Sequence, residues 1–529
     1  MTDHMPSAKA AAGKRAELLA QARAFQQSGK LLAALQAYDD LIGTGVADAD
    51  IWRETGNALS QVGEFAQAVV AYGHSRELAP ANAETHNNLS KAWYYLGDLD
   101  QALECAQQAA VLSDELTPRL NLATLIPNCP SATPSQILAV RRELGQQLQQ
   151  STARGPRRGR RKRLPGPLRV GYVSAFFHAA NYMKPVWGLI NQHDRSQVAV
   201  HLFRDSSPQA GMPGYRPDPA DRVHDTAGLR CRQLAERVAD LGIDILLDLN
   251  AYSAPERLAL FAHRGSAVQV TWFNAYATTG LPGLQYIIGD DEVIPAGEEV
   301  WFSERVLRLP LSYLTFDVQH PVPPVVAPPC LATRRITFGS LVAQYKITGP
   351  VLDAWAAILR EAPSSRLLLA NTALKSVQNR AYVQDQFSRR GVLAEQLLLH
   401  GPAPHLEYLG YYDQIDIALD AFPYNGGTTT MEALWQGVPV LALAGDRWAG
   451  RTSQTLIRAT PWGSWVAPDA ASYVERAVHW ALSPEAPERL AAHREVARAE
   501  LARSSACDTA RLARSMEQLF QQILVETSE

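Results

Sequence analysis

The stretch DIALDAFPYNGGTTTMEALWQGVPVLALAG, residues 416–445, carries the strongest fold signal in this 529-residue chain. Its apolar run 417–419 is typical of a buried strand, and the glycines and threonines after it predict a loop. A helix is expected at 431–436 and another strand at 438–444. Such a loop directs backbone N–H groups, hydroxyls and a helix N-terminus at one point, which suits phosphate. Alternatively, it is only the turn and cap that any strand–helix unit needs.

Outward from this stretch, short apolar strands alternate with helices, which predicts parallel sheets buried on both faces. A Pro-rich linker, residues 310–329, separates two such regions, so we expect α/β domains at 165–320 and 330–529 with a cleft between them. A helix is predicted within 176–190. The expected strands lie at 168–175, 198–203, 243–249, 267–273, 286–288, 336–341, 367–370 and 397–400.

The N-terminal part contains a repeat of 34 residues. Gly29, Gly63 and Gly97 mark the period, and small residues recur five positions before and after each glycine. This spacing is typical of tetratricopeptide repeats, in which small residues let antiparallel helices approach closely. We expect about three repeats over residues 14–113, serving to dock a protein or peptide. Dimerisation or simple packing is the alternative, so a homodimer stays possible.

Residues 114–164 are expected to form a helical adaptor and a basic linker. The run RGPRRGRRKR at 154–163 has seven basic residues in ten. Its glycines and proline, just before a domain start, favour a solvated linker over a nucleic-acid or membrane patch.

Composition favours a cytoplasmic protein that does not bind nucleic acid. The net charge is −3, and the five cysteines are scattered without a CxxC pair, which argues against a zinc site or a disulfide framework. No apolar run approaches the roughly 20 residues of a membrane span, and the first 20 residues lack a signal-peptide core.

Three segments together resemble the protein O-GlcNAc transferases, including their bacterial members. They are LRVGYVS at 168–174, QYKITGPVLDAWAAILREAPSSRLLL at 344–369 and DIALDAFPYNGGTTTMEALWQGVPV at 416–440, all behind the helical repeats. The resemblance implies a tetratricopeptide superhelix followed by a glycosyltransferase-B fold of two Rossmann-like domains. It also implies inverting, metal-independent transfer of GlcNAc from UDP-GlcNAc to protein Ser or Thr, with no cofactor besides the UDP-sugar donor.

The resemblance further implies roles for individual residues. Lys346 matches the lysine that contacts the diphosphate, where a cation would stabilise the charge of the leaving UDP. Thr428 and Thr429, preceded by Gly427, match threonines that hold the phosphates. Glu432 takes the place of a carboxylate that binds the ribose.

Four other positions are expected near the nucleotide. Ala403 matches an alanine whose backbone reads uracil, and His405 falls where some members have a ribose-contacting lysine. Tyr408 replaces a histidine that stacks on uracil, and an aromatic ring retains that capacity. Gln344 stands one position away from an Asn or Gln of the family, whose place is taken by Val342-Ala343.

Other positions depart from the family pattern. Ala180 stands where the family has a histidine, and residues 275–278 read AYAT in place of a GYPGT loop. His178, two residues before Ala180, is a candidate general base because the ordinary pKa of histidine suits proton transfer. A capping or packing role for His178 is the alternative.

Three hypotheses stay open at this point. The first is transfer of GlcNAc to proteins. The second is transfer of another sugar, for example to a surface protein such as flagellin, because the altered loops lie near donor or acceptor. The third is a repeat adaptor whose transferase domains are inactive. The Asp-x-Asp pairs at 48–50 and 98–100 lie in the repeats, away from the Gly-Thr loop, so no metal site is expected.

Overall fold

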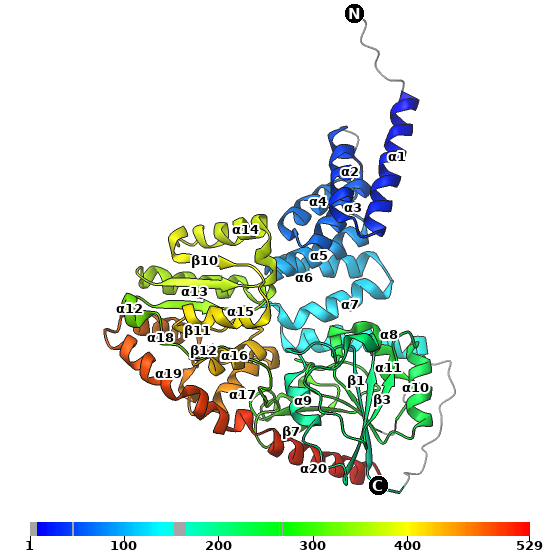
Figure 1. The fold of residues 1–529 in the computed structure, drawn as a ribbon. Helices are drawn as coiled ribbons and strands as arrows, with labels where there is room; N and C mark the ends of the chain where they lie inside the picture. Colours follow the sequence, from blue (N-terminus) through cyan, green and yellow to red (C-terminus); the bar gives the residue numbers. More distant parts are fainter. Residues whose placement is uncertain (1–7, 45–46, 153–164, 264, 267, 529) are drawn as a thin grey trace, which may run out of the picture.

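The computed structural model describes residues 8–44, 47–152, 165–263, 265–266 and 268–528, so the basic run at 154–163 lies outside the described residues. The helical repeats stand above the junction of two α/β domains that lie side by side (Figure 1). Across the described ranges, no helix is both long and apolar enough to cross a bilayer.

The repeat region consists of antiparallel helix pairs, as the sequence predicted. Gly29, Gly63 and Gly97 have φ values of 74°, 87° and 90°, a left-handed conformation that glycine adopts without strain. The glycines that repeat every 34 residues therefore lie at the end of the first helix in each pair. The helices are α1 (Ala8–Gln27), α2 (Leu31–Gly43), α3 (Ala49–Val62), α4 (Phe65–Leu78), α5 (Ala83–Leu96) and α6 (Leu99–Leu112).

Small residues allow these helices to pack closely in the second and third pairs. Ala58 and Ala92 are buried, and a Cβ on Gly56 would lie 2.5 Å from the Tyr72 ring. Ala24 occupies the same register in the first pair but is exposed.

Two adaptor helices connect the repeats to the first α/β domain: α7 (Leu116–Leu125) and α8 (Pro134–Thr152). The buried Arg141 of α8 donates hydrogen bonds to the carbonyl oxygens of Ala123, Ala275 and Thr278. A charge-assisted contact of this kind satisfies several buried carbonyl groups at once. It fastens the adaptor to residues 275–278 of the first α/β domain.

The first α/β domain has a seven-stranded parallel sheet in the order β3-β2-β1-β4-β5-β6-β7. Its helices are α9 (Lys184–Ile190), α10 (Cys231–Asp240) and α11 (Leu258–Ala262). The strands are β1 (Leu168–Ser174), β2 (Val198–Arg204), β3 (Arg222–Asp225), β4 (Ile245–Asp248), β5 (Val268–Thr271), β6 (Tyr286–Asp290) and β7 (Arg305–Leu309).

The second α/β domain has a six-stranded parallel sheet in the order β10-β9-β8-β11-β12-β13. The strands are β8 (Thr337–Ser340), β9 (Arg366–Ala370), β10 (Leu397–His400), β11 (Ile417–Leu419), β12 (Val440–Leu443) and β13 (Val466–Ala467). Its helices are α12 (Cys330–Thr333), α13 (Gly349–Glu361), α14 (Val377–Ser388), α15 (His405–Leu409), α16 (Thr428–Trp435), α17 (Thr452–Arg458), α18 (Ala470–Leu482) and α19 (Ala486–Arg503).

The predicted fold class, helical repeats before two Rossmann-like domains, is confirmed. The helix predicted within 176–190 is present and begins at Lys184, where Pro185 suits a first helical turn. Strands β3, β7 and β13 were not predicted, because β3 and β7 are rich in charge and β13 has two residues.

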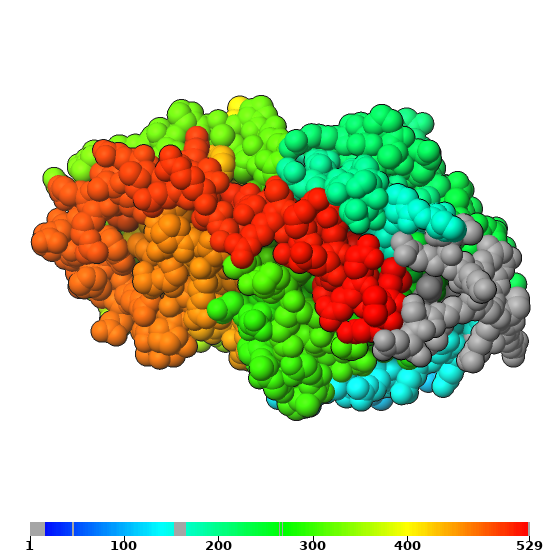
Figure 2. All heavy atoms as spheres, turned by 90° about the horizontal axis from the view of Figure 1, so that it is seen from below, coloured from blue at the N-terminus to red at the C-terminus, as the bar shows by residue number. Residues whose placement is uncertain are grey.

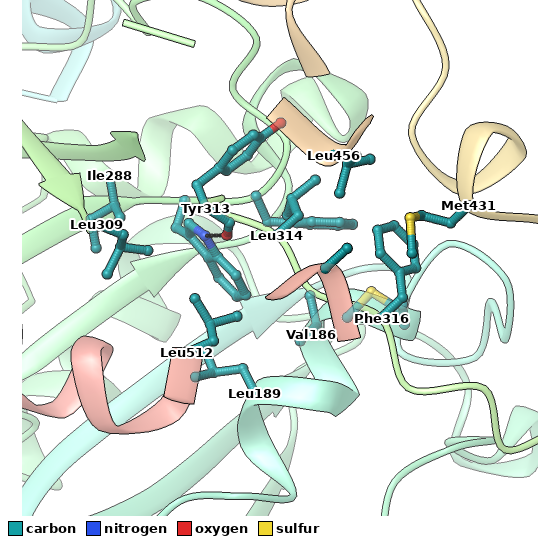
Figure 3. Packing of buried hydrophobic residues seen from close by; sticks show 14 of the residues in the cluster. Val186, Leu189, Ile288, Leu309, Tyr313, Leu314, Phe316, Met431, Leu456 and Leu512 are labelled. Carbon is teal, nitrogen blue, oxygen red and sulfur yellow. Dashed lines mark hydrogen bonds between the residues drawn. The ribbon is translucent and has the colours of Figure 1, made fainter. Parts of the chain in front are cut away.

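The two domains share one hydrophobic core. Tyr313, Leu314 and Phe316, from the Pro-rich segment after β7, are buried in it, and Phe316 lies beside Met431 of α16 (Figure 3). The Trp272 ring N–H donates to the Tyr313 carbonyl oxygen at 3.0 Å. The beginning of the predicted linker is therefore an ordered part of the interdomain packing.

The last helix, α20 (Thr509–Ser528), follows the second domain in sequence but packs on the first. Leu512 of α20 lies against Leu189 of α9 (Figure 3), and the space-filling view shows the C-terminal segment running from one domain onto the other (Figure 2). The buried His193 makes a 2.9 Å hydrogen bond from Nδ1 to Glu517. These contacts hold the two domains together.

Candidate functional site

The candidate site lies where the strand order of the second sheet reverses, between β8 and β11. At such a point the loops after two neighbouring strands turn to opposite sides and leave a crevice for a ligand. Strand β8 is followed by the turn 344–346, and β11 by the Gly-Thr loop and α16. The sheet thus brings Lys346 close to the Gly-Thr loop, as the resemblance implied.

Both backbone polar groups of Gly426 are hydrogen-bonded. Its N–H donates to the Asp420 carboxylate at 2.9 Å, and its carbonyl oxygen accepts from the Ser453 hydroxyl at 2.9 Å. A Cβ at Gly426 would lie 2.7 Å from Thr429 Oγ1. Only glycine allows the loop to approach the first turn of α16 this closely, so the free N–H groups at that turn are preorganised.

Lys346 lies directly against the Gly-Thr loop. Its Nζ donates to the Asn425 carbonyl oxygen at 2.7 Å and sits 3.9 Å from the centroid of the Tyr424 ring. Burial lowers the pKa of Lys346 to about 8, although the nearby Asp420 carboxylate favours the charged form. The site therefore places a poorly hydrated cation beside the N-terminus of α16.

Glu432 is buried one turn into α16 and is already paired. Its Oε1 lies 2.8 Å from Nζ of Lys184, which comes from the first domain, and 2.9 Å from Nε2 of His405. Burial by itself would raise the pKa of Glu432, but the His405 hydrogen bond and the Lys184 charge lower it below its usual value. The carboxylate stays ionised and faces two donors.

A small hollow borders this cluster. Its lining includes Lys184, Thr428 and Glu432 together with apolar side chains such as Phe316. The ring of His320 meets that of His405 edge-on, with centroids 4.9 Å apart. The Pro-rich segment therefore closes one side of the predicted ribose region.

The other predicted donor-binding residues have diverse surroundings. Tyr408 donates its hydroxyl to the carbonyl oxygens of Leu341 and Ala370, at 2.5 and 3.2 Å. Gln344 is buried, and its amide contacts the Leu96 carbonyl oxygen and the Asn371 side chain. Ala403 is partly exposed in the loop after β10, as reading a base through its backbone requires. Gly427 is the N-cap residue of α16, and Thr428 and Thr429 open its first turn.

The candidate base and the Asp-x-Asp pairs have other surroundings. His178 is exposed in the loop after β1. Asp48 and Asp98 cap α3 and α6. Within the described residues, no group of three His, Cys, Asp or Glu side chains is arranged to hold a metal ion.

Sequence reasoning missed Lys184, Asp420 and Ser453. Lys184 precedes a proline at the start of a helix, where a lysine is ordinarily solvated. Asp420 directly follows β11 inside the quoted stretch, and its place at the carboxyl end of a strand was an available signal. Ser453 carries no signal, since only the fold brings it to the loop.

The chain matches the model of Glycosyl transferase family 41 over residues 156–327 and 329–514. It is 30% identical over 373 residues to a probable UDP-N-acetylglucosamine–peptide N-acetylglucosaminyltransferase SPINDLY of Solanum lycopersicum, covering 67% of this chain and 38% of that protein. The corresponding SPINDLY of Oryza sativa subsp. japonica is 31% identical over 367 residues, with the same coverage. The chain thus spans well under half the length of these relatives.

The structure is similar over nearly its whole length to a lysine-to-methionine variant of the O-GlcNAc transferase from Thermobaculum terrenum. The TM-score is 0.81 at 27% sequence identity, and the match covers 99% of each chain. The similarity includes the helical repeats as well as both α/β domains.

Proposed function

This chain belongs to glycosyl transferase family 41, and from that premise we propose that it transfers a sugar from a nucleotide sugar to Ser or Thr hydroxyls of proteins. The default donor is UDP-GlcNAc, and the reaction inverts the anomeric centre without a resident metal. The repeats would hold the acceptor and raise its concentration at the cleft.

One observation carries the proposal: Lys346 and the N-terminus of α16 converge beside the Gly-Thr loop. In the proposed step the acceptor oxygen bonds to the anomeric carbon while the bond from that carbon to the diphosphate breaks. The hydroxyl proton passes to a general base, the role proposed for His178. Negative charge then grows on the departing UDP. A half-buried cation and fixed N–H groups stabilise that charge because they need no reorganisation when it appears.

The surroundings of Glu432 support its proposed contact with the ribose. An ionised carboxylate accepts hydrogen bonds from ribose hydroxyls, and the pKa of Glu432 is held below its usual value. His405 and Lys184 fix the direction of the carboxylate before the nucleotide enters. Such preorganisation lowers the entropic cost of binding.

A panel of nucleotide sugars with the purified protein and a Ser/Thr-containing acceptor tests the proposal. We expect the intact mass of the acceptor to rise by one N-acetylhexosamine per site, and only with UDP-GlcNAc. An acceptor mass that stays unchanged with every donor would contradict transferase activity.

The second candidate is the same transfer with a different nucleotide sugar. The observation that favours it is the departure from the family pattern at Ala180 and at residues 275–278, in loops expected near the donor or the acceptor. A different mass increment in the same panel would select this candidate and identify the sugar.

A further inference from the structure

The third helix pair of the repeats contacts the turn that carries Lys346 (Figure 1). The Gln344 side-chain amide donates to the Leu96 carbonyl oxygen at 3.3 Å. A Cβ on Gly97 would lie 2.5 Å from the Ile347 carbonyl oxygen. The end of α5 therefore meets the backbone of residues 344–347 at a distance that only glycine permits.

A row of stacked rings continues this contact to the site. Tyr94 of α5 stacks on Tyr345 with centroids 4.8 Å apart and planes 15° apart. Tyr345 in turn lies 6.0 Å from Tyr424 at 29°. The Lys346 ammonium sits on the Tyr424 ring. Two aromatic contacts thus separate the repeat region from the proposed charge stabiliser.

The Tyr94 ring is itself held in place. Asn128 in the adaptor donates its amide to the Tyr94 hydroxyl at 3.2 Å. The second helix pair is fixed to α14 because Asn379 donates to the Gly63 carbonyl oxygen and accepts from the Ala66 N–H, at 2.8 and 3.0 Å. The repeats are therefore held in a fixed position against residues 344–347.

We propose that Tyr94 is a positioning residue for Lys346, so that the repeats take part in the transfer step and do not only capture the acceptor; this rests on the proposed function of Lys346. The ring stack holds residues 344–347 in one conformation and keeps water from their rear face. A cation positioned within a few tenths of an ångström is worth far more to a transition state than a mobile one.

The groups that titrate around Lys346 limit what a change at Tyr94 can do. Two effects oppose each other at Lys346: burial lowers its pKa, and the Asp420 carboxylate raises it by favouring the charged amine. The effect of burial is the larger. Burial raises the pKa of the Tyr345 and Tyr424 phenols, which stay neutral. Loosening the stack admits water to Lys346, so its pKa should return toward the ordinary value of lysine.

Competitive acetylation of Lys346, followed by mass spectrometry over a pH series, measures this pKa without any turnover. Tyr94→Leu fills the space without a stacking ring, and Tyr94→Phe restores the ring. Tyr345→Leu breaks the same stack from the other side and leaves the repeats intact. Val111→Ala is the control, because Val111 is 81% exposed at the end of α6.

We expect the pKa of Lys346 to rise in Tyr94→Leu and Tyr345→Leu and to stay unchanged in Tyr94→Phe and Val111→Ala. With a short Ser/Thr peptide as acceptor, kcat should fall about tenfold in the two leucine variants, while the donor KM changes little. An unchanged pKa in both leucine variants overturns the proposal. So does a loss confined to folded protein acceptors, which would make Tyr94 a docking residue.

The two proposals fail in distinguishable ways. If the wild-type protein transfers no sugar from any donor, the proposed function fails, while acetylation still reports whether Tyr94 positions Lys346. If transfer occurs and Lys346 keeps its pKa in every variant, only the positioning role fails. Nucleotide binding, measured with UDP, and thermal unfolding show that each variant is folded.

Discussion

Lys184 of the first α/β domain and Glu432 of the second form an ion pair of 2.8 Å between Nζ and Oε1. Both side chains are buried, at 7% and 8% exposure. The pair therefore joins the domains within the cleft where the nucleotide is expected. A buried pair of this kind costs desolvation, and it persists when further hydrogen bonds, here from His405, satisfy the carboxylate.

A double-mutant cycle with Lys184→Met and Glu432→Gln measures this pair. Each single change leaves a charge buried without its partner, so each should lower the free energy of unfolding and weaken UDP binding. The loss of unfolding free energy in the double variant should be smaller than the sum of the two single losses. The difference, which is the coupling energy of the pair, should be on the order of 2 kcal/mol. Denaturant unfolding and calorimetric titration with UDP provide the two readouts. Strictly additive effects would mean that the pair contributes nothing by itself.

Replacing Lys346 tests the stabilisation of the leaving group. Lys346→Met should lower kcat by about 100-fold or more, because the cation acts chiefly on charge that develops in the transition state. Dissociation of UDP should change less than kcat. Lys375→Met serves as the control, since Lys375 is an exposed lysine of the same domain. Equal losses in the two variants would remove the special role of Lys346.

The pKa of Lys346 also predicts a pH dependence. Burial lowers this pKa to about 8, and the proposed role requires the protonated amine. The value of kcat should therefore be highest below pH 8 and fall as the pH rises through 8. A pH–rate profile checks this, with Lys346→Arg as a comparison, because a guanidinium stays charged and should remove the alkaline decline. If kcat of Lys346→Arg still declines above pH 8, the decline reflects the titration of a group other than Lys346.

Gly426→Ala tests the close packing of the Gly-Thr loop. The added methyl group would collide with the hydroxyls of Thr429 and Thr430, so the loop must shift from the first turn of α16. We expect a loss of about 1–3 kcal/mol in unfolding free energy and a loss of UDP binding. Gly410→Ala is the control, since a Cβ there meets nothing within 4 Å. Normal UDP binding by Gly426→Ala would show that this loop does not hold the diphosphate.

The paired histidines of the first sheet predict instability in acid. His201 Nδ1 lies 3.0 Å from His224 Nε2, and burial together with the His224 charge lowers the pKa of His201 to about 4. Because this folded-state pKa is below the unfolded value near 6.5, stability is complete above 6.5 and declines as the pH falls toward 4. His201→Phe should reduce that decline by on the order of 2 kcal/mol, as measured by denaturant unfolding at pH 7 and pH 4. An identical decline in both proteins would contradict this.

Signals within short segments predicted the architecture well. Gly29, Gly63 and Gly97 revealed the helix pairs, because each must adopt a conformation that other residues avoid. Apolar runs such as 417–419 revealed the strands, because strands buried on both faces need continuous hydrophobic side chains. The charged strand β3 and the two-residue β13 were not predicted, because neither contains a continuous apolar run.

For the site, the quoted stretch and its family resemblance pointed to the Gly-Thr loop and to Lys346, which the structure brings into contact. His178 was proposed as a base because it lies two residues before the position of the family's histidine and because the ordinary pKa of histidine suits proton transfer. The structure places it, exposed, in the loop after β1. Lys184 was missed because nothing in its neighbourhood distinguishes a buried lysine from a solvated one.

The sequence by itself therefore determined the elements: the helix ends at the repeat glycines, the buried strands, and the loop between β11 and α16. Only the tertiary structure decided which distant residues meet, such as Lys184 with Glu432, 248 positions apart, and Tyr94 with Tyr345. The physical reason is that backbone conformation and hydrophobic periodicity act over a few neighbouring residues. Contacts across the cleft depend on how two sheets and a helical wall pack, which no short segment encodes.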